Sequence, residues 1–225
     1  MSNPVITIDG PSGSGKGTIS QLLAQKLNFH MLDSGALYRL TALAGALQGV
    51  AMDDEAALTA VAESLEVLFE TDGETLRIVL QGQDVTERIR SETVSMNASR
   101  VAAYPGVRGA LLERQRAFRQ PPGLVADGRD MGTVVFPAAQ VKIFLTASAE
   151  ERARRRYQQL REKGESACFD AILEDIVARD GRDKNRAAAP LKPADDAHIL
   201  DSTAMSIDAV LASVFAIVET QLGPL

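Results

Sequence analysis

Short apolar runs alternate along most of the chain with segments of helical periodicity. Five of the runs predict buried strands, at Val5–Asp9, Phe29–Leu32, Leu124–Asp127, Val141–Leu145 and His198–Asp201. Six segments predict helices, at Gly15–Leu27, Gly35–Ala46, Val107–Phe118, Ala149–Lys163, Phe169–Arg179 and Met205–Gln221. This alternation is typical of a parallel sheet covered by helices. We therefore expect a three-layer α/β fold around a five-stranded parallel sheet, with residues 1–225 forming a single domain.

The pattern changes between residues 64 and 92. Leu65–Glu70 and Thr75–Leu80 predict two strands joined by a turn at Thr71–Glu74, and a third strand follows near Gln83–Val85. From Asp53 to Glu92 the chain holds 11 of its 30 acidic residues but 3 of its 24 basic residues. We therefore expect a small, acidic, antiparallel β insert. The stretch Ala187–Pro193 predicts a loop before the last strand.

Composition excludes several classes of protein. The chain has 225 residues with a formal charge of −6, 45% hydrophobic and 24% charged residues, which is ordinary for a folded domain and unusual for a general nucleic-acid binder. One Cys and two His make a disulfide framework or a Cys- or His-rich metal centre implausible. No apolar run approaches the ~18 residues of a membrane span, and the start of the chain does not resemble a secretory signal. We expect a cytoplasmic protein and, since no exposed apolar stripe is evident, a monomer.

A glycine-rich loop directly follows the first predicted strand and precedes the first predicted helix. Its residues are Gly10, Pro11, Ser12, Gly13, Ser14, Gly15, Lys16, Gly17 and Thr18. A strand, glycine-rich loop and helix in this order predict a phosphate-binding loop, in which backbone N–H groups surround phosphate oxygens and Lys16 reaches the β- and γ-phosphates of ATP. Gly17 stands where a Ser or Thr would contact Mg²⁺. We therefore expect phosphates and water to hold the metal ion.

The charged residues indicate which kind of molecule would accept a phosphoryl group from the nucleotide on this loop. No Asn-Lys-x-Asp guanine-reading motif is present, because the nearest string, Asp183-Lys184-Asn185-Arg186, does not match. A GTPase switch is therefore a weaker interpretation than a kinase. A general base is hard to find, since His30 and His198 lie in or beside predicted strands, although Asp33 or Asp130 could serve. A phosphate monoester has a second pKa of about 6 and needs no base at pH 7, so the many arginines favour a phosphate acceptor.

Four strings occur together in an order that is distinctive. They are Gly10–Thr18 (GPSGSGKGT), Leu32–Arg39 (LDSGALYR), Ala126–Pro137 (ADGRDMGTVVFP) and Arg179–Arg186 (RDGRDKNR). Together they resemble the bacterial cytidylate kinase family, and the resemblance covers essentially the whole chain. It implies a P-loop fold and the transfer of a phosphoryl group from ATP, with Mg²⁺, to CMP or dCMP. It also implies an acceptor-binding region at 35–100 that contains the β insert near 64–92, and a short lid at 149–165.

The resemblance also implies roles for individual residues. Arg39 would hold the acceptor phosphate with help from Arg129, and Ser34 would lie beside the acceptor nucleotide. Ser99, Arg108 and Asp130 would read the cytosine edge. The remaining assignments place Asp183 and Arg179 at the ribose, Arg186 at phosphates, and Arg155 and Arg156, with Arg152, in the lid.

Hydrogen bonding supports the assignment of Asp130. Cytosine presents an N4 amino donor beside the N3 acceptor, so a carboxylate at Asp130 accepts from the first and Arg108 donates to N3 or O2. Uracil would place a carbonyl against the carboxylate and would be rejected. The structural alternative is an ion pair between Asp130 and an arginine.

Three further residues have both a functional and a structural interpretation. Asp127 ends an apolar strand, where it would either approach Mg²⁺, directly or through water, or cap a turn. Tyr38 would pack in the core or line the acceptor site. Cys168 precedes a predicted helix and is expected to have only a packing role.

Two other functions stay open at this stage. One is a P-loop kinase with a different acceptor, such as UMP or a metabolite without phosphate. The other is a nucleotide-dependent binding switch without kinase activity.

Overall fold

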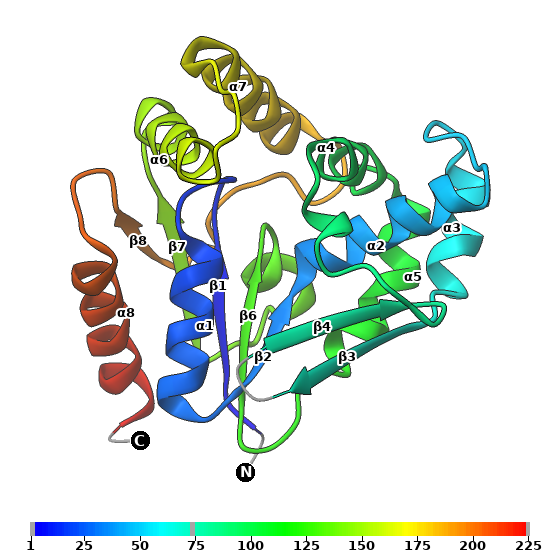
Figure 1. Cartoon of the computed structure of the whole chain (residues 1–225). Helices are drawn as coiled ribbons and strands as arrows, with labels where there is room; N and C mark the ends of the chain where they lie inside the picture. The colour runs from blue at the N-terminus through cyan, green and yellow to red at the C-terminus, as the bar shows by residue number, and fades with distance from the viewer. Residues whose placement is uncertain (1–2, 73–74, 224–225) are drawn as a thin grey trace. The chain divides into compact units, whose positions relative to one another are not determined.

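The computed structural model describes residues 3–72 and 75–223, shown in Figure 1. The chain forms two compact units. Unit 1 combines the described residues up to Asp33 with those from Arg116 onward, and unit 2 is Ser34–Gln115. Most residues predicted to hold the donor nucleotide lie in unit 1, so this unit is described first.

Within the described residues, unit 1 contains a parallel sheet with the strand order β2-β6-β1-β7-β8. The strands are β1 (Val5–Asp9), β2 (His30–Asp33), β6 (Leu124–Gly128), β7 (Val141–Thr146) and β8 (His198–Asp201). All five residues of β1 are buried, as expected for a central strand of a parallel sheet that is covered on both faces. The five-stranded parallel sheet is therefore confirmed, with boundaries within a residue of those predicted.

The register of the sheet aligns the carboxyl ends of its central strands. Asp9 at the end of β1 pairs with Gly128 at the end of β6, and on the other side of β6 Asp33 pairs with Asp127. Chain segments that follow these strands therefore start from one edge of the sheet. In open α/β sheets this edge is where ligands bind.

One face of the sheet is covered by α1 (Lys16–Leu27) and α8 (Ile207–Leu222), which lie beside each other in Figure 1. Ile19 and Leu23 of α1 and Val214 of α8 join Ile6 and Ile8 of β1 in one buried cluster. The apolar spacing that predicted both helices is thus the spacing of their buried residues. The observed ends lie within two residues of the predicted ones.

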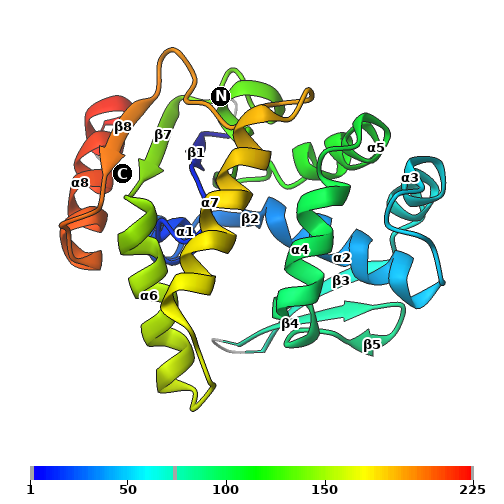
Figure 2. The same ribbon diagram turned by 90° about the horizontal axis from the view of Figure 1, so that it is seen from above.

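Helices α6 (Ala149–Glu162) and α7 (Phe169–Asn185) run side by side, as Figure 2 shows. The prediction ended α7 at Arg179, and that end was wrong by six residues. Asp180 and Asp183 of the extra turns are held by arginines of unit 1, Arg152 and Arg129 respectively. These ion pairs explain why the helix continues through Gly181, a residue with low helical propensity.

Unit 2 is built around α2 (Ser34–Leu47), most of whose residues are buried. The insert forms an antiparallel sheet of β3 (Val67–Asp72), β4 (Thr75–Leu80) and β5 (Gln83–Asp84), which confirms the predicted insert. Two residues of the predicted turn, Thr71 and Asp72, belong to β3, and its other two, 73 and 74, lie outside the described residues.

The remaining helices of unit 2 were partly missed. α5 (Pro105–Arg116) was predicted with an end two residues later, whereas α3 (Glu55–Glu63), α4 (Glu92–Val101) and the short 3₁₀ turn Arg88–Arg90 were not predicted. The side chain of Asp54 caps α3 by accepting from Ala57 N, and Ser91 caps α4. Asp and Ser are preferred N-caps, so these two signals were present in the sequence.

No helix in the part of the chain that the structure describes combines the length and apolar character needed to cross a membrane.

Gly10 directly follows β1 and lies against the backbone of Leu145 in β7. Its φ is +151°, and a Cβ on it would lie 2.0 Å from the backbone oxygen of Leu145. We predict that Gly10→Ala lowers the free energy of unfolding in urea by at least about 2 kcal/mol, because backbone must move to make room. Gly49→Ala is the matched control: φ there is +73° with no atom within 4 Å of the added Cβ, so about 1 kcal/mol is expected. Equal losses for the two variants would contradict this account.

Candidate active site

The phosphate loop occupies the connection from β1 to α1. α1 begins at Lys16 with Gly15 as its N-cap, and Gly13 and Gly15 have φ of +77° and +94°. These left-handed conformations turn the chain so that successive N–H groups face one concavity. The first turn of α1 adds its own N–H groups and partial positive charge. The backbone at Gly13 and Gly15 therefore has a conformation that the predicted phosphate loop requires.

Lys16 is buried at the base of this loop. Its side chain is 6% exposed, and Nζ donates a hydrogen bond to Pro11 O at 2.9 Å. Burial and the nearby cation of Arg129 lower the pKa of Lys16 to about 8, although the carboxylates of Asp127 and Asp9 act in the opposite direction. An ammonium group held in this state gains strongly from a phosphate anion placed beside it.

Asp127 of β6 faces the same loop. Its Oδ1 is 3.9 Å from Lys16 Nζ, and a Cβ on Gly17 would lie 3.5 Å from its Oδ2. The described residues contain no cluster of three or more His, Cys, Asp or Glu side chains that could hold a metal ion. One partly buried carboxylate beside a phosphate loop fits Mg²⁺, which usually takes one or two carboxylates and completes its shell with phosphates and water.

Arg129 and Asp183 form an ion pair between the segment after β6 and the end of α7. Arg129 Nε donates to Asp183 Oδ2 at 3.0 Å, and their side chains are 20% and 8% exposed. Burial raises the pKa of Asp183, but Arg129, Arg179 and Arg186 oppose it, so that the pKa is below its usual value. Four of the predicted acceptor-site residues are thus electrostatically coupled in unit 1.

The predicted lid arginines differ in their surroundings. Arg152 is 2% exposed and donates to Asp180, to Ser12 O at 3.0 Å and to Ala147 O. It therefore anchors α6 to the phosphate loop and to α7. Arg155 donates to Ser202 O at 2.6 Å and pairs with Glu151.

Arg156 of the predicted lid and Arg186 at the end of α7 were also predicted site residues. Arg156 lies next in α6 and is partly exposed, and Arg186 donates through Nε to Ala189 O.

Four predicted acceptor residues lie in unit 2. They are Ser34, Arg39, Ser99 and Arg108, on α2, α4 and α5. The guanidinium carbon of Arg108 is 5.7 Å from the ring centre of Tyr38, and Nη1 donates to Ala102 O at 3.1 Å. Ser99 Oγ is buried and has no hydrogen-bond partner among the described residues. A buried hydroxyl in this state is a candidate contact for a ligand.

Asp130 is 2% exposed and immediately precedes a π-helical turn at Met131–Val135. Its backbone oxygen accepts from Val134 N and Val135 N at 2.9 and 3.2 Å. This turn was not predicted, and π-helical turns are frequent at functional sites. The backbone of Asp130 is therefore fixed by the turn that follows it.

Sequence reasoning missed Asp9, the last residue of β1. Its side chain accepts from Met131 N and Gly132 N, both at 2.8 Å, and the residue is 5% exposed. Burial and the negative charge of Asp130 raise the pKa of Asp9 to about 7, although the two backbone donors act in the opposite direction. The available signal was a carboxylate ending an apolar strand directly before a glycine-rich loop.

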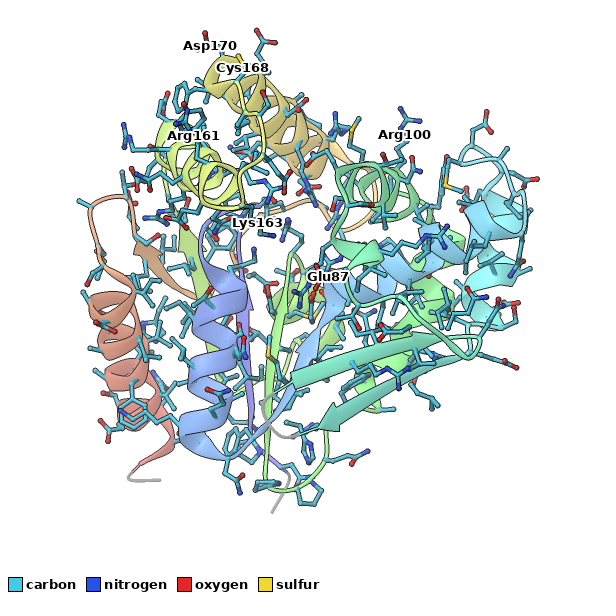
Figure 3. The ribbon with its side chains drawn as sticks, in the orientation of Figure 1. Glu87, Arg100, Arg161, Lys163, Cys168 and Asp170 are labelled. Carbon is cyan, nitrogen blue, oxygen red and sulfur yellow. The ribbon has the colours of Figure 1, made fainter. Side chains whose placement is uncertain are left out.

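The two histidines and the cysteine lie away from the phosphate loop. His30 contacts Pro121 O at 2.8 Å and is exposed on β2, and His198 is exposed on β8. The packing role expected for Cys168 was wrong, because this residue is exposed ahead of α7, where Figure 3 shows it beside Asp170 on the outside of the molecule.

Comparison with known proteins gives one consistent result. The sequence profile of the cytidylate kinase family matches residues 6–220. A cytidylate kinase of Aeromonas hydrophila is 62% identical over 220 residues, which are 98% of this chain and 96% of the relative. Those of Stutzerimonas stutzeri and Vibrio cholerae are 61% and 57% identical, covering 95% and 97% of this chain and 94% and 97% of their own.

The position of Lys16 generates a first prediction. Lys16→Met, which keeps the length of the side chain and removes its charge, should lower turnover about 100-fold or more, because the negative charge on the transferred phosphate loses its buried partner. A coupled assay of ADP release measures this. Lys26→Ala on the same helix is the control and should stay within about 2-fold. Since burial of the Lys16 ammonium is costly, Lys16→Met should unfold at the same or a higher urea concentration than the unsubstituted protein. Near-normal turnover of Lys16→Met would show that the phosphate loop is misassigned.

The pKa of Asp9 generates a second prediction. Between about pH 4 and pH 7 the folded chain keeps a proton on Asp9 that the unfolded chain releases, so this residue makes stability fall as pH rises through that window. The free energy of unfolding, compared with that of Asp9→Asn, should therefore decrease by up to about 1.4 kcal/mol per pH unit. Urea titrations of both proteins at pH 5 and pH 7 measure the difference. A difference that does not change with pH would mean that Asp9 is ionised throughout.

Proposed function

Since this chain belongs to the cytidylate kinase family, it is a kinase that phosphorylates CMP with ATP as the donor, and we propose how its residues divide this work. We also propose dCMP as an acceptor. The observation that carries the assignment is the burial of Lys16 at the base of the phosphate loop, 3.9 Å from the Asp127 carboxylate. This arrangement supplies the charge that a nucleoside triphosphate and its metal ion require.

The donor side consists of Gly10–Thr18 and Asp127. The backbone N–H groups of the loop bind the β- and γ-phosphates, and Lys16 holds the γ-phosphate oxygens while their charge redistributes. Asp127 is the residue that would hold Mg²⁺ brought with ATP, through water, and the ion would supply positive charge that offsets the charge of the phosphates. The arginines that we assign to the lid, Arg155 and Arg156 within 149–165, neutralise further phosphate charge.

The acceptor side supplies positioning and charge. Arg39 and Arg129 orient the phosphate of CMP, one of whose oxygens attacks the γ-phosphorus in line. This phosphate is already dianionic at pH 7, so no side chain has to remove a proton. Asp183 and Arg179 contact the ribose, and Arg186 contacts phosphate. The coupling of Asp183 to Arg129 supports this division, because one carboxylate then orders several cations before the substrate binds.

The base is read by Asp130, with Ser99 and Arg108. Asp130 accepts from the N4 amino group of cytosine and Arg108 donates to N3 or O2. Two observations support this assignment: Asp130 is almost fully buried, and Ser99 Oγ has a hydrogen bond to give or accept. A site of this kind rejects uracil, whose O4 carbonyl faces the carboxylate without a donor between them.

The larger organisation follows from these roles. We infer that residues 35–100, including the insert near 64–92, move as an acceptor-binding region and that the lid at 149–165 closes over ATP. Closure excludes water, which would otherwise accept the phosphoryl group. We also infer a monomer that works in the cytoplasm, where its nucleotide substrates are made and used.

A panel of acceptors tests the proposal. ADP release is measured with ATP and Mg²⁺ and with CMP, dCMP, UMP, AMP or shikimate as acceptor. CMP and dCMP should exceed UMP by at least about 10-fold in kcat/KM, because cytosine offers an N4 amino donor to Asp130 where uracil presents a carbonyl. AMP, whose purine is larger than cytosine, and shikimate, which carries no phosphate, should be inactive. CMP turnover no better than UMP would refute the base-reading assignment. Slow ATP hydrolysis that no acceptor changes would indicate a binding switch.

A further inference from the structure

Asp9 joins the strand that enters the phosphate loop to the turn that carries Asp130. Both of its carboxylate oxygens are used: Oδ1 accepts from Met131 N and Oδ2 accepts from Gly132 N, each at 2.8 Å. These two amides directly follow Asp130 in the chain. A carboxylate bound by two consecutive N–H groups fixes both the position and the orientation of that backbone.

The turn has little freedom to move away from β1. Met131 is fully buried, and a Cβ on Gly132 would lie 2.9 Å from Thr7 Oγ1 and 3.2 Å from the Lys142 side chain. The backbone oxygen of Asp130 is in turn held by Val134 N and Val135 N. Asp130 therefore lies between two sets of hydrogen bonds, one formed within its own turn and one formed by Asp9.

A carboxylate is a costly way to satisfy two amides at this place. Asp9 is 5% exposed, and the charge of Asp130 opposes its ionisation. A neutral side chain would avoid both costs, but no neutral side chain of this length offers two acceptor oxygens. The bidentate geometry is therefore the feature that requires Asp.

We propose that Asp9 is a positioning residue that orients Asp130 and so sets the preference for cytosine over uracil. The proposal rests on the function proposed above, in which Asp130 reads the base. It adds that a residue of the strand leading into the phosphate loop controls recognition of the acceptor. Asp9 itself is buried beneath the turn and acts through the backbone of Met131 and Gly132.

The primary test is Asp9→Asn, assayed at pH 8, where Asp9 is mostly ionised. The asparagine oxygen accepts from one amide, and its NH₂ group opposes the other, so the turn must shift. The ratio of kcat/KM for CMP to that for UMP should fall about 10-fold. The affinity for ATP, measured without acceptor, should stay within about 3-fold. An unchanged ratio, or an equal loss for CMP and UMP, would overturn the proposal.

A double-mutant cycle separates positioning from general stability. Asp130→Asn should lower the ratio by itself, because an amide can also donate to the uracil carbonyl. In that background Asp9→Asn should change the ratio by less than about 2-fold, since the group that it positions is gone. An equal effect of Asp9→Asn in both backgrounds would overturn the inference alone. An unchanged ratio in Asp130→Asn by itself would overturn both the base-reading assignment and the inference.

Two further variants complete the design. Gly132→Ala perturbs the clamped amide from the side of Thr7 and leaves Asp9 intact, so it should lower the ratio as well and carries the test if Asp9→Asn does not fold. Asp54→Asn is the matched control, because Asp54 also accepts a backbone N–H, from Ala57 at the start of α3. For Asp54→Asn, the ratio of kcat/KM for CMP to that for UMP should stay within about 2-fold of the ratio for the unsubstituted enzyme. The proposed role of Asp9 would be contradicted if Gly132→Ala left the ratio of kcat/KM for CMP to that for UMP unchanged. It would also be contradicted if Asp54→Asn lowered this ratio as much as Asp9→Asn does.

Discussion

The burial of charge at the carboxyl ends of β1 and β6 is the constraint on which the rest of the structure depends. Lys16, Asp9 and Asp130 are each less than a tenth exposed, and Asp127 is little more so. Charges out of contact with water need partners, because their solvation is otherwise lost. The loop carbonyl at Pro11 and the amides of Met131 and Gly132 supply those partners. The same groups that make burial tolerable also fix the positions of Lys16 and of the Asp9 carboxylate.

Arginine–carboxylate pairs extend this order to the helices. Arg129 with Asp183 connects the segment after β6 to α7, and Arg152 with Asp180 connects α6 to α7 while also reaching the phosphate loop. Phosphoryl transfer depends on positive charge that is in place before the reaction begins. Partly buried pairs keep the guanidinium groups in defined positions at some cost in solvation. Such a cost is common at functional sites, where local stability gives way to chemistry.

Unit 2 has a different character. Its central helix α2 is largely buried, and Arg108 makes contacts within the unit, with Tyr38 and with the Ala102 carbonyl. The buried hydroxyl of Ser99 stands out because it has no partner in the described part of the chain. These features suit a region that recognises a second substrate. Most of the buried ionisable groups discussed above, by contrast, belong to unit 1.

The sequence by itself determined the parallel sheet, the phosphate loop and the antiparallel insert, because hydrophobic period, glycine spacing and turn residues are local properties. It also indicated the chemistry through the strings that include Arg39, Arg129 and Asp183. Local patterns did not show the true end of α7 or the role of Asp9. Asp9 and Met131 are 122 positions apart, and β1 and β6 bring them together by parallel pairing. Only the tertiary structure decided which donors each buried carboxylate meets, because such contacts depend on the register between distant strands.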